Sequence, residues 1–163
     1  MLGGFAMLVS WNTTNQCNMF CDHCYRDAGV RSEDELSTAQ ARKLIEEIKG
    51  AGFQIMIFSG GEPLMRTDIY ELASFATGLG LRAVMGTNGS LITAEVARKI
   101  KEAGFMAAGV SLDSLDPAKN NNFRKLDNAY QLTVEGMRYL KEAGVPFQIH
   151  TTVMDWNVGE LEA

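Results

Sequence analysis

Two hydrophobic patterns alternate along the chain, one with helical spacing and one made of short β-rich apolar runs. The switch from the first to the second falls on Gly52, Gly80, Gly104 and Gly144. Glycine takes the left-handed backbone conformation that commonly ends a helix, and apolar residues at helical spacing precede these glycines. The pattern therefore predicts helices over residues 38–50, 68–78, 94–103 and 128–143.

Residues that cap helices stand at the start of these segments. Ser37 followed by Gln40 predicts a capping box, in which each side chain bonds to the backbone of the other residue. Thr67, Thr93 and Asp127 are suitable N-caps for the other three helices.

The β-rich runs alternate with the helices and are joined to them by short connections, which is typical of a parallel sheet in an α/β protein. We expect strands at about residues 7–13, 53–59, 81–87, 106–112 and 146–153. No linker or low-complexity tract divides the chain, so residues 1–163 are expected to form one domain. The segment 157–161 resembles the opening of a further helix, and we expect the domain to be the amino-terminal part of a longer protein.

Composition narrows the class of protein. With 163 residues, of which 46% are hydrophobic, the chain can bury a core. It carries 15 basic and 20 acidic residues, a net charge of −5 without a basic run, which argues against nucleic-acid binding. No apolar stretch is long enough to span a membrane, and the N-terminus lacks the positive charge of a secretory signal. We expect a cytoplasmic protein.

The candidate metal ligands are Cys17, Cys21 and Cys24, the 3 cysteines of the chain, which lie together on one short polar segment. An odd set of cysteines cannot all form disulfides, and without a signal sequence it favours metal chemistry in a reducing compartment. Three thiolates can hold an iron–sulfur cube and leave its fourth iron open. The alternative is a zinc site that adds His23, although His23 directly precedes Cys24 and the two would be strained on one ion.

Other unusual residues follow the expected strands, where ligands gather in parallel α/β folds. Gly60 and Gly61 would allow the backbone to approach a ligand closely. Glu62 and Asp113 offer carboxylates to an amine or to ribose hydroxyls. The segments at these strand ends are 59–63, 87–89, 111–114 and 154–157.

The cysteine spacing, followed by Gly60-Gly61-Glu62-Pro63 after the next strand, resembles the radical S-adenosylmethionine (radical SAM) superfamily. The resemblance covers essentially the whole chain, with the motifs in the same order and on the same elements. It implies an α/β fold of the TIM-like type, a partial (β/α)6 barrel, of which this chain would supply the first five βα units.

The resemblance also implies a cofactor set. Cys17, Cys21 and Cys24 would ligate three irons of a [4Fe-4S] cluster, and S-adenosylmethionine would chelate the fourth iron through its amino and carboxylate groups. The reduced cluster would cleave this cofactor to methionine and a 5′-deoxyadenosyl radical that takes hydrogen from the substrate. A low-potential donor such as ferredoxin or flavodoxin would supply the electron.

Further residues are carried over as S-adenosylmethionine contacts. Gly60, Gly61 and Glu62 match the motif that holds the amino group, and Arg124 would pair with the carboxylate because arginine presents a planar fork. The resemblance places four more residues beside the cofactor: Thr87, Asn88, Ser111 and Asp113.

Each of these residues also has a purely structural interpretation. Gly60-Gly61 and Asn88-Gly89 are each compatible with a simple turn. Ser111 and Asp113 can cap local backbone. Arg124 lies in a polar stretch that we expect to be a loop, where a solvated arginine is the alternative.

His150 is the candidate substrate residue. In the expected fifth strand it alternates with apolar neighbours, so it falls on the face that a barrel strand turns to the lumen. His150 would bind or protonate the substrate there, and the alternative is a lumen histidine without a chemical role.

Three stretches, 11–29, 111–116 and 146–153, resemble one branch of the superfamily in particular. It contains the enzymes of the alternative haem route and of haem d1 formation, which remove or alter acetate and propionate side chains of iron porphyrinoids. The peptide-modifying and sulfatase-maturating enzymes are the alternative, since they share the same amino-terminal barrel. A non-catalytic cluster-binding or electron-transfer remnant is a further alternative.

Overall fold

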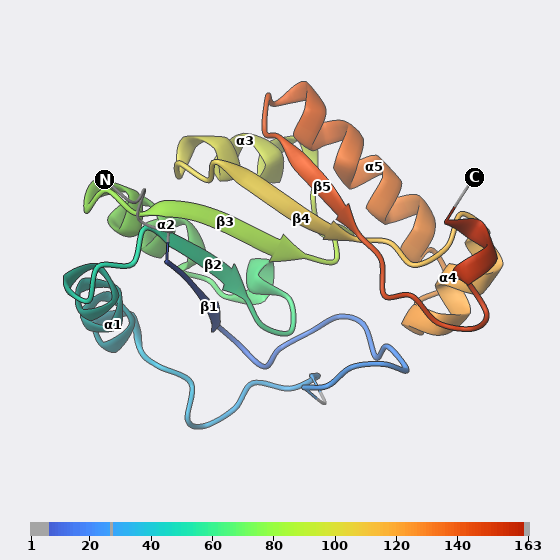
Figure 1. Cartoon of the computed structure of the whole chain (residues 1–163), viewed down its shortest axis with the longest axis horizontal. Coiled ribbons are helices and arrows are strands. Elements are labelled where there is room, and N and C mark those ends of the chain that lie inside the picture. Colours follow the sequence, from blue (N-terminus) through green and yellow to red (C-terminus); the bar gives the residue numbers. More distant parts are fainter. Residues whose placement is uncertain (1–6, 27, 162–163) are drawn as a thin grey trace, which may run out of the picture.

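The computed structural model describes residues 7–26 and 28–161, which form a parallel sheet covered by helices. Five strands lie side by side in chain order (Figure 1). They are β1 (Leu8–Asn12), β2 (Ile55–Ser59), β3 (Arg82–Thr87), β4 (Ala107–Ser111) and β5 (Phe147–His150). The helices are α1 (Thr38–Gly50), α2 (Ile69–Gly78), α3 (Ala94–Glu102), α4 (Pro117–Arg124) and α5 (Ala129–Glu142).

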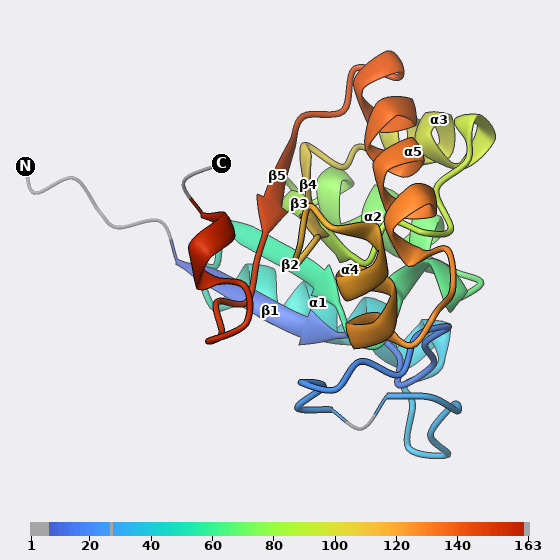
Figure 2. The ribbon, with the colours of Figure 1, turned by 90° about the vertical axis from the view of Figure 1, so that its right-hand side faces the viewer.

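The hydrophobic core lies between the sheet and the helices, which Figure 2 shows on one face of the sheet. Alternate residues of the central strands, such as Met56, Phe58 and Met85, are fully buried on this face. Helix α1 buries Ala41, Ile45 and Ile48. The intervening strand residues face away from the helices, because side chains alternate along a strand. No helix of the described residues is both long and apolar enough to cross a bilayer.

The predicted helix ends are largely confirmed. The capping box of Ser37 and Gln40 is formed, and the Thr93 hydroxyl accepts a hydrogen bond from the backbone of Val96. The glycines after the helices take the left-handed conformation, with φ of 89° at Gly52, 79° at Gly80, 86° at Gly104 and 69° at Gly144.

Two predicted caps are wrong. Helices α2 and α5 begin after Asp68 and Asn128, not after Thr67 and Asp127, and neither of the observed caps makes a side-chain hydrogen bond to its helix. The Asp68 carboxylate is already used, because it accepts hydrogen bonds from Arg66 and Thr38.

Helix α4 corrects the prediction of a loop around Arg124. Its start is well specified, because the Asp116 carboxylate accepts hydrogen bonds from the backbone of Ala118 and Lys119 and Pro117 occupies the first turn. The polar residues Asn120–Asn122 give no hydrophobic pattern from which this helix could be predicted, although Asn120 and Phe123 are both buried.

The end of the sheet also differs from expectation. Strand β5 ends at His150 rather than near residue 153. Beyond it, Thr151 donates to the Leu112 carbonyl and the Thr152 N–H donates to the Asp113 carboxylate, so side-chain bonds replace the ladder. The expected terminal helix is present as one 3-10 turn, Val158–Glu160.

Candidate functional site

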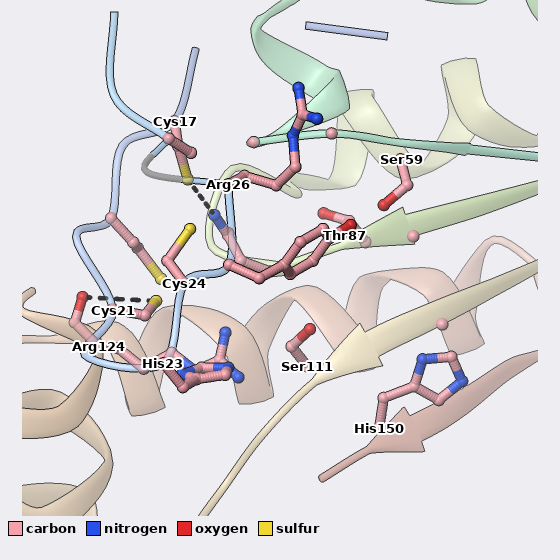
Figure 3. A pocket seen from close by; sticks show the side chains of 18 residues that line it. Cys17, Cys21, His23, Cys24, Arg26, Ser59, Thr87, Ser111, Arg124 and His150 are labelled. Carbon is pink, nitrogen blue, oxygen red and sulfur yellow. Dashed lines mark hydrogen bonds between the residues drawn. The ribbon is translucent and has the colours of Figure 1, made fainter. Parts of the chain in front are cut away.

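A cavity of about 210 Å³ opens where the carboxyl ends of the strands meet the connection between β1 and α1. Figure 3 shows the three cysteine side chains on one side of it and His150 on the other. Its lining also includes Gly60, Gly61, Thr87, Asn88, Ser111 and Arg124. The cavity therefore brings together most of the residues that the sequence singled out; Glu62 and Asp113 lie behind its wall.

The three thiols are free and half-buried, and all of them line the cavity. Within residues 7–26 and 28–161, no three His, Cys, Asp or Glu side chains are arranged to hold a single metal ion. The His23 ring stacks on Phe123 with ring centroids 4.6 Å apart and planes 11° apart. Three thiols around a cavity fit a cluster held at three corners.

Burial affects the protonation of two of these thiols. It raises the pKa of Cys17 and of Cys21, and for Cys21 the Arg124 guanidinium opposes this rise. Cys17 and Cys21 are therefore protonated in the metal-free protein at neutral pH, and ligation of iron by these two thiols would release protons.

The two glycines after β2 admit the backbone of the cysteine loop, which we define as residues 13–36. A Cβ at Gly60 would lie 2.5 Å from the Thr14 carbonyl oxygen, and one at Gly61 would lie 2.2 Å from that of Gln16. Gly60 also has a φ of 139°, a backbone conformation that residues with a Cβ atom rarely adopt. The close approach seen here is thus between two segments of this chain, at the rim of the cavity.

Glu62 is fully buried and does not line the cavity. Its carboxylate accepts hydrogen bonds from the Thr87 hydroxyl and from the backbone N–H of Asn88 (2.8 Å) and Leu64 (3.1 Å). Burial raises the pKa of Glu62 to about 7, and these bonds oppose the rise. Glu62 thereby joins the ends of β2 and β3.

Asn88 connects this buried carboxyl group to the cysteine loop. Its side-chain amide donates to the Asn18 side chain at 2.9 Å and lies 3.9 Å from the Cys17 sulfur. Gly89 after it has a φ of 79°, so the turn interpretation of Asn88-Gly89 also holds. The backbone at Gly89 forms the turn, whereas the side chain of Asn88 contacts Cys17.

Arg124 is buried, which corrects the alternative of a solvated arginine in a loop. Its guanidinium forms an ion pair with Asp113, with only 6% and 0% of the two side chains exposed. The Asp113 carboxylate also accepts from the Thr152 N–H. The Arg124 Nε atom is buried and has no hydrogen-bond partner among the described residues. Because Arg124 lines the cavity, this unpartnered donor fits an acceptor atom of a bound ligand.

His150 lies on the lumen face of β5, as its position in the strand pattern predicts. Its ring covers Gly109, where a Cβ would lie 2.4 Å from the His150 Cε1 atom. The absence of a side chain at Gly109 therefore creates the place for the imidazole, which lines the cavity together with Ser111.

The sequence reasoning missed several residues of the cavity wall. Gly86 and Gly109 both line it, and they pair directly with each other across β3 and β4. A glycine inside a strand often marks a site where something approaches closely, so the two strand glycines were the available signal.

Comparisons with known proteins agree with this geometry. The family model described as "Radical SAM superfamily" matches residues 11–163. An "AdoMet-dependent heme synthase" of Oleidesulfovibrio alaskensis is 44% identical over 90% of this chain and 38% of its own length. An "Fe-coproporphyrin III synthase" of Methanosarcina barkeri is 40% identical over 96% of this chain and 39% of its own length. The chain thus spans about two fifths of these curated relatives.

A solved structure extends the agreement to the fold. Streptococcus suis SuiB bound to S-adenosylmethionine superposes with a TM-score of 0.74 at 21% identity, over 95% of this chain and 36% of that one. The partial barrel that the sequence predicts is thereby confirmed. Radical SAM enzymes use a [4Fe-4S] cluster and S-adenosylmethionine. With its family model matched over residues 11–163, the chain belongs to the radical SAM superfamily.

Proposed function

We propose that this chain is the radical-generating core of an enzyme that modifies side chains of an iron porphyrinoid in haem or haem d1 formation, by oxidative decarboxylation or side-chain loss. The single observation that carries the radical chemistry is the set of three free thiols around one cavity beside the unpartnered Arg124 Nε. The choice of substrate class rests on the two haem-related relatives, at 44% and 40% identity.

The proposal gives the cavity residues the following tasks. Cys17, Cys21 and Cys24 would hold the cluster, and Arg124 would donate from Nε to the carboxylate of S-adenosylmethionine. The other residues proposed for the site of this cofactor are Gly60, Gly61, Glu62, Thr87, Asn88, Ser111 and Asp113. When bound and reduced, the cluster supplies one electron that breaks a carbon–sulfur bond of S-adenosylmethionine, which yields methionine and the 5′-deoxyadenosyl radical that takes a hydrogen atom from the substrate.

Two of these residues would act through their neighbours. The Glu62 carboxylate has its acceptor sites directed at Thr87 and Asn88, so it would orient Asn88 beside Cys17. The Asp113 carboxylate would orient Arg124 through their buried ion pair. Both would therefore shape the cofactor site from behind the cavity wall.

On the substrate side, His150 would bind or protonate the porphyrinoid. The Arg26 side chain gives the wall a positive charge, and no carboxylate is among the described residues that line it, which suits a substrate with carboxylate side chains. We also propose a low-potential electron donor such as ferredoxin or flavodoxin as partner. A cytoplasmic location would suit three free thiols.

The radical chemistry is tested by anaerobic reconstitution with iron and sulfide, followed by S-adenosylmethionine and dithionite. We expect an iron–sulfur spectrum that changes when S-adenosylmethionine is added, and production of 5′-deoxyadenosine. Cys21→Ala should abolish both. An intact cluster without cleavage would indicate a cluster-binding remnant instead, and a protein that takes up only zinc would contradict the proposal.

The substrate class is tested with an iron porphyrin that carries deuterated propionate groups. We expect deuterium to appear in 5′-deoxyadenosine, measured by mass spectrometry. His150→Ala should reduce this transfer more than it reduces uncoupled cleavage, because His150 is assigned to the substrate and not to the cofactor. Transfer from a peptide substrate, with none from the porphyrin, would overturn the haem assignment.

A further inference from the structure

The cysteine loop, residues 13–36, is held at its base by a buried arginine that no motif of the cofactor site includes. Its described residues, 13–26 and 28–36, have little regular structure, and the cysteines lie between the two ends of the loop. Its first residue follows β1 and its last precedes the Ser37 cap of α1. Backbone hydrogen bonds attach parts of the loop to the segment after β2 and to α4, and a link between its two ends would restrict the thiols further.

Arg66 supplies this link from the segment after β2. Its Nη1 atom donates to the Thr13 carbonyl at 2.8 Å, and its Nη2 atom donates to the Leu36 carbonyl at 2.9 Å. One rigid guanidinium therefore binds the backbone at both ends of the loop. Lysine cannot reproduce this geometry, because its ammonium group is a single point on a flexible stem.

The surroundings of Arg66 fix its orientation. Nε and Nη2 donate to the two oxygens of Asp68, at 2.6 and 3.0 Å, and the side chain is only 4% exposed. The Glu35 carboxylate lies 3.6 Å from Nη1 and is 6% exposed. Two carboxylates face this buried cation, and Glu35 also pairs with Arg31 at 3.6 Å. Removal of Arg66 would leave the Asp68 carboxylate without its cation.

A hydrogen-bond chain leads from this cluster to the first cysteine. The Thr14 hydroxyl donates to Glu35 at 2.9 Å and accepts from the Gln16 N–H at 3.0 Å. Gln16 directly precedes Cys17, and its carbonyl accepts from the Glu62 N–H at 2.7 Å. Arg66 is thus connected to the backbone of a cluster ligand through Glu35 and Thr14.

We infer that Arg66 is a positioning residue for the iron–sulfur site: it clamps the two ends of the cysteine loop and presets the thiols before the cluster is bound. The inference rests on the proposed function for the identity of the cluster. The clamp itself rests only on the contacts of this chain.

Arg66→Lys tests the clamp, with Arg42→Lys as the matched control, because Arg42 pairs with Glu71 on the surface. The first measurement is the rate at which a chelator removes iron from the reconstituted protein. We expect about tenfold faster loss for Arg66→Lys, the lower end of the range for residues that orient metal ligands, and no change for Arg42→Lys. An unchanged rate for Arg66→Lys would overturn the inference.

The second measurement is amide hydrogen exchange of the metal-free proteins. The Cys17 and Gly29 N–H groups, which bond to Gly29 and Asn15 within the loop, should exchange faster in Arg66→Lys, while the amides of β3 and β4 keep their wild-type rates. Equal acceleration of loop and sheet would show a general structural role and would overturn the inference. This comparison remains decisive if the wild-type protein binds no cluster, in which case only the proposed function fails.

Should Arg66→Lys not fold, Thr14→Val replaces it. This variant keeps every charge and removes only the hydroxyl between Glu35 and Gln16. Selective acceleration at Cys17 and Gly29 is again expected, and wild-type exchange there would exclude the connection.

Discussion

At the scale of single residues, the two buried carboxyl groups near the cavity have opposite electrostatic surroundings. Asp113 faces the Arg124 guanidinium, whereas Glu62 accepts hydrogen bonds only from neutral hydroxyl and backbone groups. Hydrogen bonds from neutral donors only partly replace the hydration of a charge. Burial therefore prevails at Glu62 and raises its pKa from 4.5 to about 7.

This pKa makes stability depend on pH. Between pH 4.5 and about 7 the folded state holds a proton on Glu62 that the unfolded state has lost, so stability falls as pH rises through this window. The full effect corresponds to about 3 kcal/mol. In urea unfolding of the metal-free protein, Glu62→Gln should show a smaller decrease of unfolding free energy from pH 5 to 8, by about this amount. The exposed Glu46→Gln should behave as wild type, and an unchanged slope for Glu62→Gln would refute the assignment.

The ion pair of Asp113 and Arg124 gives a second prediction. Asp113→Asn preserves the shape of the side chain but leaves the Arg124 cation buried without its partner. We expect a loss of about 3 kcal/mol in unfolding free energy, measured by urea unfolding. Glu135→Gln breaks an ion pair with Arg138 that is about half exposed, and should cost at most about 0.5 kcal/mol. Equal effects of the two substitutions would contradict this reasoning.

Among site residues, the sequence predicted those whose residue type and spacing specify the chemistry, namely the three cysteines and the glycines after β2. It did not predict that Arg124 is buried against Asp113. The two residues are 11 positions apart, and only helix α4 brings them together. Arg66 was missed because its partners, Thr13 and Leu36, lie 53 and 30 positions away in the chain.

At the scale of elements, the sequence predicted the strands and helices whose apolar faces enter the core. Helix α4 was missed because a polar segment with one buried aromatic residue, Phe123, carries no apolar period. It nevertheless matters for the site, because the Asp22 N–H of the cysteine loop donates to the Phe123 carbonyl at 3.1 Å. Helix α4 contributes to the site through specific hydrogen bonds, and hydrophobic periodicity does not predict these.

The packing of α5 on the turn after β3 gives a prediction at this scale. A Cβ at Gly136 would lie 2.3 Å from the Gly89 carbonyl oxygen, a backbone atom that cannot move away easily. Gly136→Ala should therefore lower the unfolding free energy by about 2 kcal/mol, although alanine favours helices. At Gly78, in the last turn of α2, nothing lies within 4 Å of the added Cβ, so Gly78→Ala should be neutral or stabilise by up to about 1 kcal/mol. Thermal unfolding of both variants distinguishes packing from propensity, and a stabilised Gly136→Ala would contradict the close contact.

At the scale of the whole molecule, the hydrophobic core and the cysteine loop are largely separate. Among the described residues, the main buried cluster lies between the sheet and the helices and includes none from the cysteine loop, although Leu36 at the end of the loop packs against it. The loop is attached by Arg66 at its base, by the backbone after β2, and by α4 near Asp22. The sequence predicted the core from its periodicity, but these attachments depend on contacts between distant segments.

The separation predicts how the protein responds to removal of iron. Because the described members of the main buried cluster all lie outside the cysteine loop, chelation should leave the far-UV circular dichroism and the cooperative unfolding transition in place. The loss should be local: trypsin should cut first after Arg26 and Arg31, two exposed loop residues, and more slowly in the reconstituted protein. Mass spectrometry of the early fragments would locate these cuts. If chelation instead removed the cooperative transition, the cluster would be part of what folds the sheet, and the division between core and loop would be wrong.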